Sequence, residues 1–170
     1  MVSLKEENMN TNDIEQAIIP LIRDAPERLI EQGNHSNADW TTAIFTALTK
    51  YAYDLNLRVW TKKNEKDPTL KGCLYDFMIC EGKTPIDIDR LWVAMESEWN
   101  PKFDEIKYDF CKLIQSRSML RVMVFQSRDV ERTISGLVNI LETSQISISG
   151  DRYLFAGWSD ENGLYSTNRG

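Results

Sequence analysis

Four features that often assign a function or a location are missing from this sequence. No apolar run approaches the roughly 18 residues of a membrane-spanning helix, and the first residues contain no signal-peptide core. The single histidine, His35, lies in a polar stretch without a partner motif, which argues against the usual hydrolase triads. Neither GxGxxG nor GxxxxGKS/T occurs, so no glycine-rich phosphate loop is expected. Because a membrane-spanning run and a signal-peptide core are both missing, we expect a cytoplasmic protein that does not contact a membrane.

Cysteine and positive charge are also scarce. The three cysteines are odd in number and lack metal-ligand spacing, which favours buried thiols in a reducing compartment. Lys and Arg number 20 against 26 Asp and Glu, for a net charge of −6. This argues against a general nucleic-acid coat protein, because phosphate affinity comes mainly from Lys and Arg. A local basic groove remains open: the lysine-rich loop at residues 62–71 fits either a solvated loop or a phosphate contact.

The length of 170 residues predicts one domain, large enough to bury about 70% of its unfolded surface. We expect this domain to span residues 11–158. The polar stretches at 1–10 and 159–170 are expected to be loose termini.

Hydrophobic periodicity predicts an α/β fold in the order helix, helix, three strands, helix, strand, helix, strand. Pro20 predicts a kink or an early end of the first helix, with a new N-cap at residues 24–27. The middle strands can form an antiparallel meander, and the next strand follows a crossover helix, which gives a mixed central sheet flanked by helices. The expected helices are 12–33, 37–51, 101–117 and 128–142, and the expected strands are 57–61, 73–80, 91–100, 119–126 and 153–158.

The stretch at residues 91–100 begins as an apolar strand and ends in two glutamates. Side chains two apart in a strand share a face, so Glu96 and Glu98 point to the same side, with Cα atoms about 6.6 Å apart. At an effective dielectric of about 20, like charges at that separation repel by roughly 2.5 kcal/mol. A divalent metal, a lysine or open water must offset this repulsion.

Asp76 is the one charged residue of the strand expected at 73–80. Neighbouring strands lie only about 4.8 Å apart, so Asp76 can approach Glu96 and Glu98. Among metals Mg²⁺ fits such carboxylates best, whereas Zn²⁺ fits poorly without His or Cys. The alternative is that the glutamates end a strand in solvent and that Asp76 faces water at a sheet edge.

The order of these motifs resembles the PD-(D/E)XK phosphodiesterase superfamily, the fold of type II restriction endonucleases. The similarity covers residues 58–125: an aspartate, a Glu-x-Glu strand end about twenty residues later, a helix and an apolar strand. The resemblance implies a restriction endonuclease-like fold in which Asp76 and Glu96 bind Mg²⁺ or Mn²⁺. Its third motif position is usually lysine and is Glu98 here, a residue found there in some restriction enzymes.

Some members of that superfamily supply the lysine from the following helix, which makes Lys112 the candidate for the displaced cation. The alternative for Lys112 is a solvated pair with Asp109.

Two functions stay open. One is a metal-dependent nuclease with Asp76, Glu96, Glu98 and Lys112 as catalytic residues, acting on nucleic acid. The other is a catalytically inactive nuclease-like module that binds a protein partner or takes part in assembly.

Overall fold

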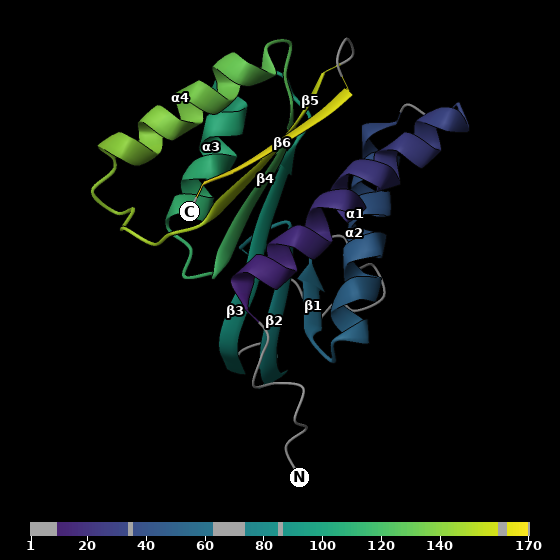
Figure 1. Cartoon of the computed structure of the whole chain (residues 1–170), viewed down its shortest axis with the longest axis vertical. Coiled ribbons are helices and arrows are strands. Elements are labelled where there is room, and N and C mark those ends of the chain that lie inside the picture. Colours follow the sequence, from purple (N-terminus) through teal and green to yellow (C-terminus); the bar gives the residue numbers. More distant parts are fainter. Residues whose placement is uncertain (1–9, 34–35, 63–73, 85–86, 160–162, 170) are drawn as a thin grey trace. The chain divides into compact units, whose positions relative to one another are not determined.

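The computed structural model describes residues 10–33, 36–62, 74–84, 87–159 and 163–169 (Figure 1). Its contacts divide the chain into two units, residues 1–48 and 49–170, and the boundary falls within the second helix. Each unit is therefore described by itself. The expectation of a single domain over residues 11–158 stays a prediction.

The first unit contains helix α1 (Thr11–Glu31) and most of α2 (Asn37–Asp54). The side chain of Asn10 caps α1 by accepting a hydrogen bond from Asp13 N at 3.1 Å. The expected early end at Pro20 and the new cap at residues 24–27 are wrong, because α1 continues through both Pro20 and Pro26. The alternative expectation of a kink at Pro20 stays a prediction. An internal proline costs about 3 kcal/mol, but burial of each isoleucine side chain contributes roughly 1.5–3 kcal/mol. The apolar residues buried at every fourth position of α1 are Ile14, Ile18, Ile22 and Pro26.

The second unit is built on a six-stranded sheet in which the strands lie in sequence order. Both β1/β2 and β2/β3 pair antiparallel, and β3/β4 and β4/β5 pair parallel, so the expected meander and crossover in a mixed sheet are confirmed. Each parallel connection passes through a helix. The strands are β1 (Arg58–Thr61), β2 (Phe77–Thr84), β3 (Asp87–Glu98), β4 (Leu120–Gln126), β5 (Tyr153–Ser159) and β6 (Gly163–Arg169).

Helices α3 (Phe103–Ile114) and α4 (Val130–Thr143) lie on one face of this sheet (Figure 1). A single buried cluster joins them to the strands, and it includes Phe110 of α3, Leu137 of α4 and Phe155 of β5. The two helices approach each other closely at Gly136, where an added Cβ would lie 2.7 Å from the ring of Phe103. This shared core holds the helices against the strand ends that carry the candidate residues.

Three strands differ from the sequence-based expectation, and one of them is β3, which begins at Asp87 rather than at residue 91. Residues 163–169 form β6, which pairs antiparallel with β5, so the expectation of a loose tail is wrong for these residues. A polar edge strand can form through backbone hydrogen bonds to its neighbour alone, so the hydrophobic pattern of the sequence does not predict it. The strand expected at 73–80 begins at Phe77 and continues to Thr84. Asp76 therefore precedes β2, consistent with the low strand propensity of aspartate.

Candidate metal and phosphate site

Three charged residues lie side by side where β1, β2 and β3 meet. Thr61 pairs with Phe77, and Phe77 pairs with Met95. The adjacent positions on these strands are Lys62, Asp76 and Glu96, which we call the charged row. Alternation places the row on the sheet face that carries α3, the face to which Ala94 of the buried cluster also belongs.

Asp76 is held from two sides. Its Oδ1 lies 3.1 Å from Nζ of Lys62, and its Oδ2 accepts a hydrogen bond from Ser97 N at 3.0 Å. The backbone N–H of Lys62 also donates to the carbonyl of Asp76, at 3.2 Å. These contacts orient the carboxylate toward the end of β3. The sequence pattern predicted only that Lys62 belongs to a basic loop. Its contact with Asp76 was not predicted, because the pairing of β1 with β2 is what brings the lysine to the aspartate.

Glu96 is the most deeply buried member of the row, with no exposed surface. Its Oε1 forms an ion pair with Nζ of Lys112 at 2.9 Å, and among the described residues its Oε2 finds no donor. The pKa of Glu96 is raised to about 8, mainly by burial. The Lys112 ammonium lowers this pKa, and the nearby Asp76 carboxylate raises it. The site therefore holds a carboxyl group that lacks full compensation for its charge.

Lys112 reaches this site from α3. Its Nζ also lies 2.7 Å from Oδ1 of Asp109, so the ammonium bridges two carboxylates. Burial lowers the pKa of Lys112, but the carboxylates of Asp109 and Glu96 outweigh it and raise that pKa above its usual value. The expected pair with Asp109 and the expected approach to the end of β3 thus occur together, and Lys112 carries a permanent positive charge beside Glu96.

Glu98 follows on the same face but makes a different contact. Its Oε1 accepts a hydrogen bond from Asn100 N at 2.6 Å. Burial raises the pKa of Glu98, which the Asn100 N–H lowers and the nearby Asp109 carboxylate raises. In the part of the chain that the structure describes, no three His, Cys, Asp or Glu side chains are grouped as metal ligands would be. The structure therefore brings together Asp76, Glu96 and Lys112, and it leaves Glu98 beside them on its own backbone contact.

The chemistry of the charged row suits a hard divalent cation. Asp76 and Glu96 supply carboxylate oxygens from neighbouring strands, and Mg²⁺ is commonly held by one or two carboxylates together with water and substrate oxygens. The unpartnered, buried Oε2 of Glu96 is a donor atom without a role in the protein's own contacts. Lys62 and Lys112 already offset part of the negative charge of the row. The cation that the protein itself places beside Glu96 is Lys112.

Other residues noted in the sequence contribute less. Trp99 is partly buried beside Glu98. His35 and the lysines at positions 63, 66 and 71 lie outside the described residues. The residue that sequence analysis missed completely is Arg121, a buried cation in the otherwise apolar strand β4. A charged residue within an apolar strand is the same signal that identified Asp76.

Comparison with known proteins found no match among family models, curated proteins or solved structures. Membership of the PD-(D/E)XK superfamily therefore stays a prediction. Within the described residues, no helix has the length and apolar character needed to cross a membrane.

Proposed function

We propose that this chain is a Mg²⁺- or Mn²⁺-dependent phosphodiesterase of restriction endonuclease-like type that cleaves nucleic acid. The observation that carries the proposal is Glu96, a fully buried carboxyl group with one unpartnered oxygen, flanked by Asp76 and by a lysine from the next helix. Burying a carboxyl group without compensation for its charge costs free energy, and such groups cluster at functional sites, where a bound ligand supplies the missing compensation.

Each residue of the site has a role in this proposal. Asp76 and Glu96 hold the metal, and Lys62 and Ser97 N keep Asp76 oriented. Glu98 orients the attacking water, and Lys112 stabilises negative charge on the phosphate. When bound, the metal lowers the pKa of its water and polarises the scissile phosphate.

The topology also supports the proposal. The resemblance requires an antiparallel meander, a crossover helix and a parallel strand, and β1 to β4 have this order and these directions. The aspartate and the first glutamate lie at adjacent ends of neighbouring strands, as the metal ligands of that superfamily do.

The test is a cleavage assay with single- and double-stranded DNA and with RNA, in Mg²⁺ and in Mn²⁺. Glu96→Gln keeps the shape of the side chain and removes its charge, and Asp76→Asn keeps an acceptor for Ser97 N. We expect each variant to lose at least about a hundredfold in rate, because even outer-shell changes at metal sites cost 10–100-fold. Glu131→Gln, an exposed carboxylate on α4, is the charge-matched control and should cleave as the wild type does. Equal cleavage by all four proteins, or none with any substrate, would reject the proposal.

A second candidate is a non-catalytic module with the same fold, which binds a protein partner. The observation that favours it is that Lys62 and Lys112 already pair with Asp76 and Glu96, as structural lysines do. Calorimetric titration of the protein with Mg²⁺ and Mn²⁺ separates the two. Binding that Glu96→Gln removes supports the enzyme, whereas the absence of binding supports the module.

A further inference from the structure

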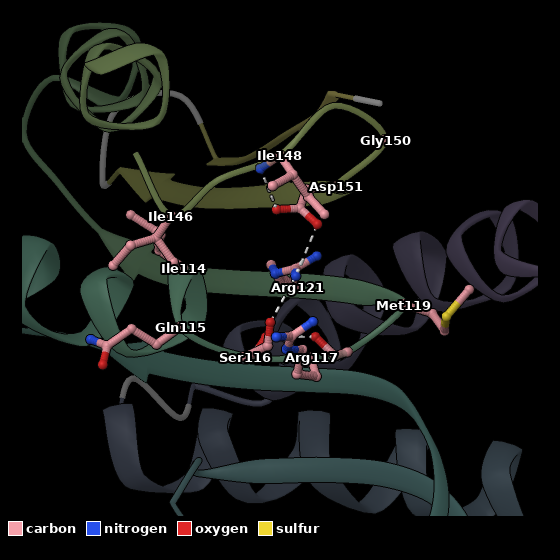
Figure 2. A pocket seen from close by; sticks show the side chains of 11 residues that line it. Ile114, Gln115, Ser116, Arg117, Met119, Arg121, Ile146, Ile148, Gly150 and Asp151 are labelled. Atoms are coloured by element: carbon pink, nitrogen blue, oxygen red, sulfur yellow. Dashed lines mark hydrogen bonds and ion pairs between the residues drawn. The ribbon is translucent and has the colours of Figure 1, made fainter. Parts of the chain in front are cut away.

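A polar pocket lies on the same sheet face as the charged row, where β4 and β5 begin. Its volume is about 530 Å³, within the range of small-molecule sites. Figure 2 shows the guanidinium of Arg121 between Ser116 and Asp151, with Ile114 and Ile146 on one side of the pocket. We call it the arginine pocket. Arg117 and Ile148 also line it.

Arg121 forms the buried part of the pocket, with only 5% of its surface exposed. Its Nη2 donates to the Ser116 carbonyl at 2.7 Å and pairs with Oδ1 of Asp151 at 3.1 Å, and Cζ lies 5.2 Å from the ring centroid of Tyr153. Its Nε has no acceptor among the described residues. A guanidinium has five N–H donors, so this buried cation is incompletely satisfied by the protein.

The local charge of the pocket is positive although the chain is acidic. Arg117 is exposed and makes no ion pair or hydrogen bond with the residues that the structure describes. Asp151 is the only carboxylate lining the pocket, and its Oδ2 is engaged by Ile148 N at 3.0 Å. The two guanidinium groups that line the pocket therefore outnumber its one carboxylate, whose oxygens are engaged by Arg121 and by Ile148 N.

The rim of the pocket is apolar. Ile146 and Ile148 expose 60% and 65% of their surfaces, although isoleucine is usually buried. Both lie in the connection between α4 and β5, and the Ile148 backbone is tied to Asp151. A ligand that contacts this rim and the arginines together needs an apolar part and an anionic part.

We propose that the arginine pocket binds a small organic anion, in which a carboxylate or phosphate group on a short apolar body pairs with Arg117 and Arg121. Planar guanidinium groups bind both oxyanions in bidentate geometry. The proposal does not rest on the nuclease assignment. Glu96 pairs with Met123, which lies two residues beyond Arg121 on β4, so Glu96 and Arg121 are about 7 Å apart along the strand at roughly 3.3 Å per residue. The arginine pocket shares no lining residue with the charged row.

The test is an NMR titration of the full chain, which follows backbone amides, with four probes. Hexyl phosphate and hexanoate carry both parts of the expected ligand, inorganic phosphate carries only the anion, and hexan-1-ol carries only the apolar body. We expect saturable shifts at Ser116, Arg117, Ile148 and Asp151 with one or both of the first two probes. The stronger of those two identifies the oxyanion. Inorganic phosphate and hexan-1-ol should bind more weakly.

Two variants check the assignment. Arg117→Gln alters an exposed side chain and should weaken binding roughly tenfold, the effect of losing a hydrogen bond to a charged group. Arg121→Lys keeps the charge but loses the planar donors and should weaken it at least as much. Arg128→Gln removes an equal charge at the far end of β4 and should bind normally. No saturable shift with either amphiphile, shifts confined to other residues, equal binding of hexan-1-ol, equal binding of inorganic phosphate, or unchanged affinity in Arg117→Gln would each overturn the proposal.

Discussion

Glu96 and Arg121 are buried ions of opposite sign on neighbouring strands of one sheet face. Glu96 lies near the end of β3 and Arg121 at the start of β4, and each is paired with a single oppositely charged group from a flanking segment. Lys112, the partner of Glu96, is shared with Asp109, whereas Asp151, the partner of Arg121, is fixed by the backbone of Ile148. Each buried ion keeps one polar atom without a partner among the described residues.

The two ions differ in how they respond to their burial. A carboxyl group can take up a proton, and burial raises the pKa of Glu96 to about 8. A guanidinium stays charged at every relevant pH, so Arg121 must be compensated by its neighbours. The end of β3 is therefore sensitive to pH and suited to cations, and the start of β4 is a constant positive charge suited to anions.

The largest effect is expected at Arg121. Arg121→Met leaves the poorly exposed carboxylate of Asp151 without its partner, and breaking a buried pair costs about 3 kcal/mol or more. Glu96→Gln, by contrast, should not destabilise the protein at neutral pH, because the raised pKa of about 8 keeps the Glu96 carboxyl group mostly protonated there and the neutral amide has the same shape. Urea denaturation of both variants at pH 7 measures the difference. Comparable losses of stability in the two would remove the contrast between the sites.

The second prediction concerns stability against pH. The pKa of Glu96 in the folded protein, about 8, lies above the ordinary glutamate value of 4.5, so between these values the folded state binds a proton that the unfolded state lacks. The stability contributed by this proton is present below pH 4.5 and is lost as pH rises toward 8, by at most about 1.4 kcal/mol per pH unit.

Glu96→Gln should lack this contribution. Subtracting its free energies of unfolding from those of the wild type, at steps from pH 4.5 to 9, isolates the term from other titrating groups. A difference that does not change across this range would mean that Glu96 ionises normally in the fold.

The third prediction sharpens the view of the β3 end as a cation site. A metal competes with the proton on Glu96, so the affinity for Mg²⁺ should rise by up to about tenfold per pH unit until pH reaches about 8. Below that pH, binding should release protons, which calorimetry detects as a dependence on the ionisation enthalpy of the buffer. Affinity that is constant from pH 6 to 8 would show that the metal does not use this carboxyl group.

The smallest effect is expected at Lys62. The Lys62 side chain is 43% exposed, and pairs of this kind typically contribute less than about 1 kcal/mol. Lys62→Met should therefore change stability by less than that amount, measured by urea denaturation, while Asp76 keeps its bond from Ser97 N. A loss of stability as large as that of Arg121→Met would mean that Lys62 stabilises the fold and does not merely orient Asp76.

Much of the second unit follows from local pattern. Apolar runs and 3.6-residue periodicity identify β3, β4, α3 and α4, and the helix between β3 and β4 leads to the crossover. The pattern fails at Pro20, where burial of the α1 stripe outweighs a local helix breaker. It fails again at β6, whose stability comes from backbone pairing with β5.

The candidate site was accessible from sequence only in part. Charges that interrupt apolar strands or end them, Asp76 and Glu96, are visible as a conflict between residue type and environment. The side-chain contact of Glu98 with Asn100 N is not visible in this way, because it depends on the backbone path after β3. Nor does any spacing in the chain reveal that Asp151 is the partner of Arg121, thirty residues away.

By itself the sequence determined every element except β6, the order of those elements and the candidate carboxylates, because periodicity and propensity act over a few residues. Only the tertiary structure decided which cations meet those carboxylates and which ion keeps an unpartnered atom. Compensation of a buried charge depends on distance and on exclusion of water, and both arise only when β3, β4 and α3 have packed together.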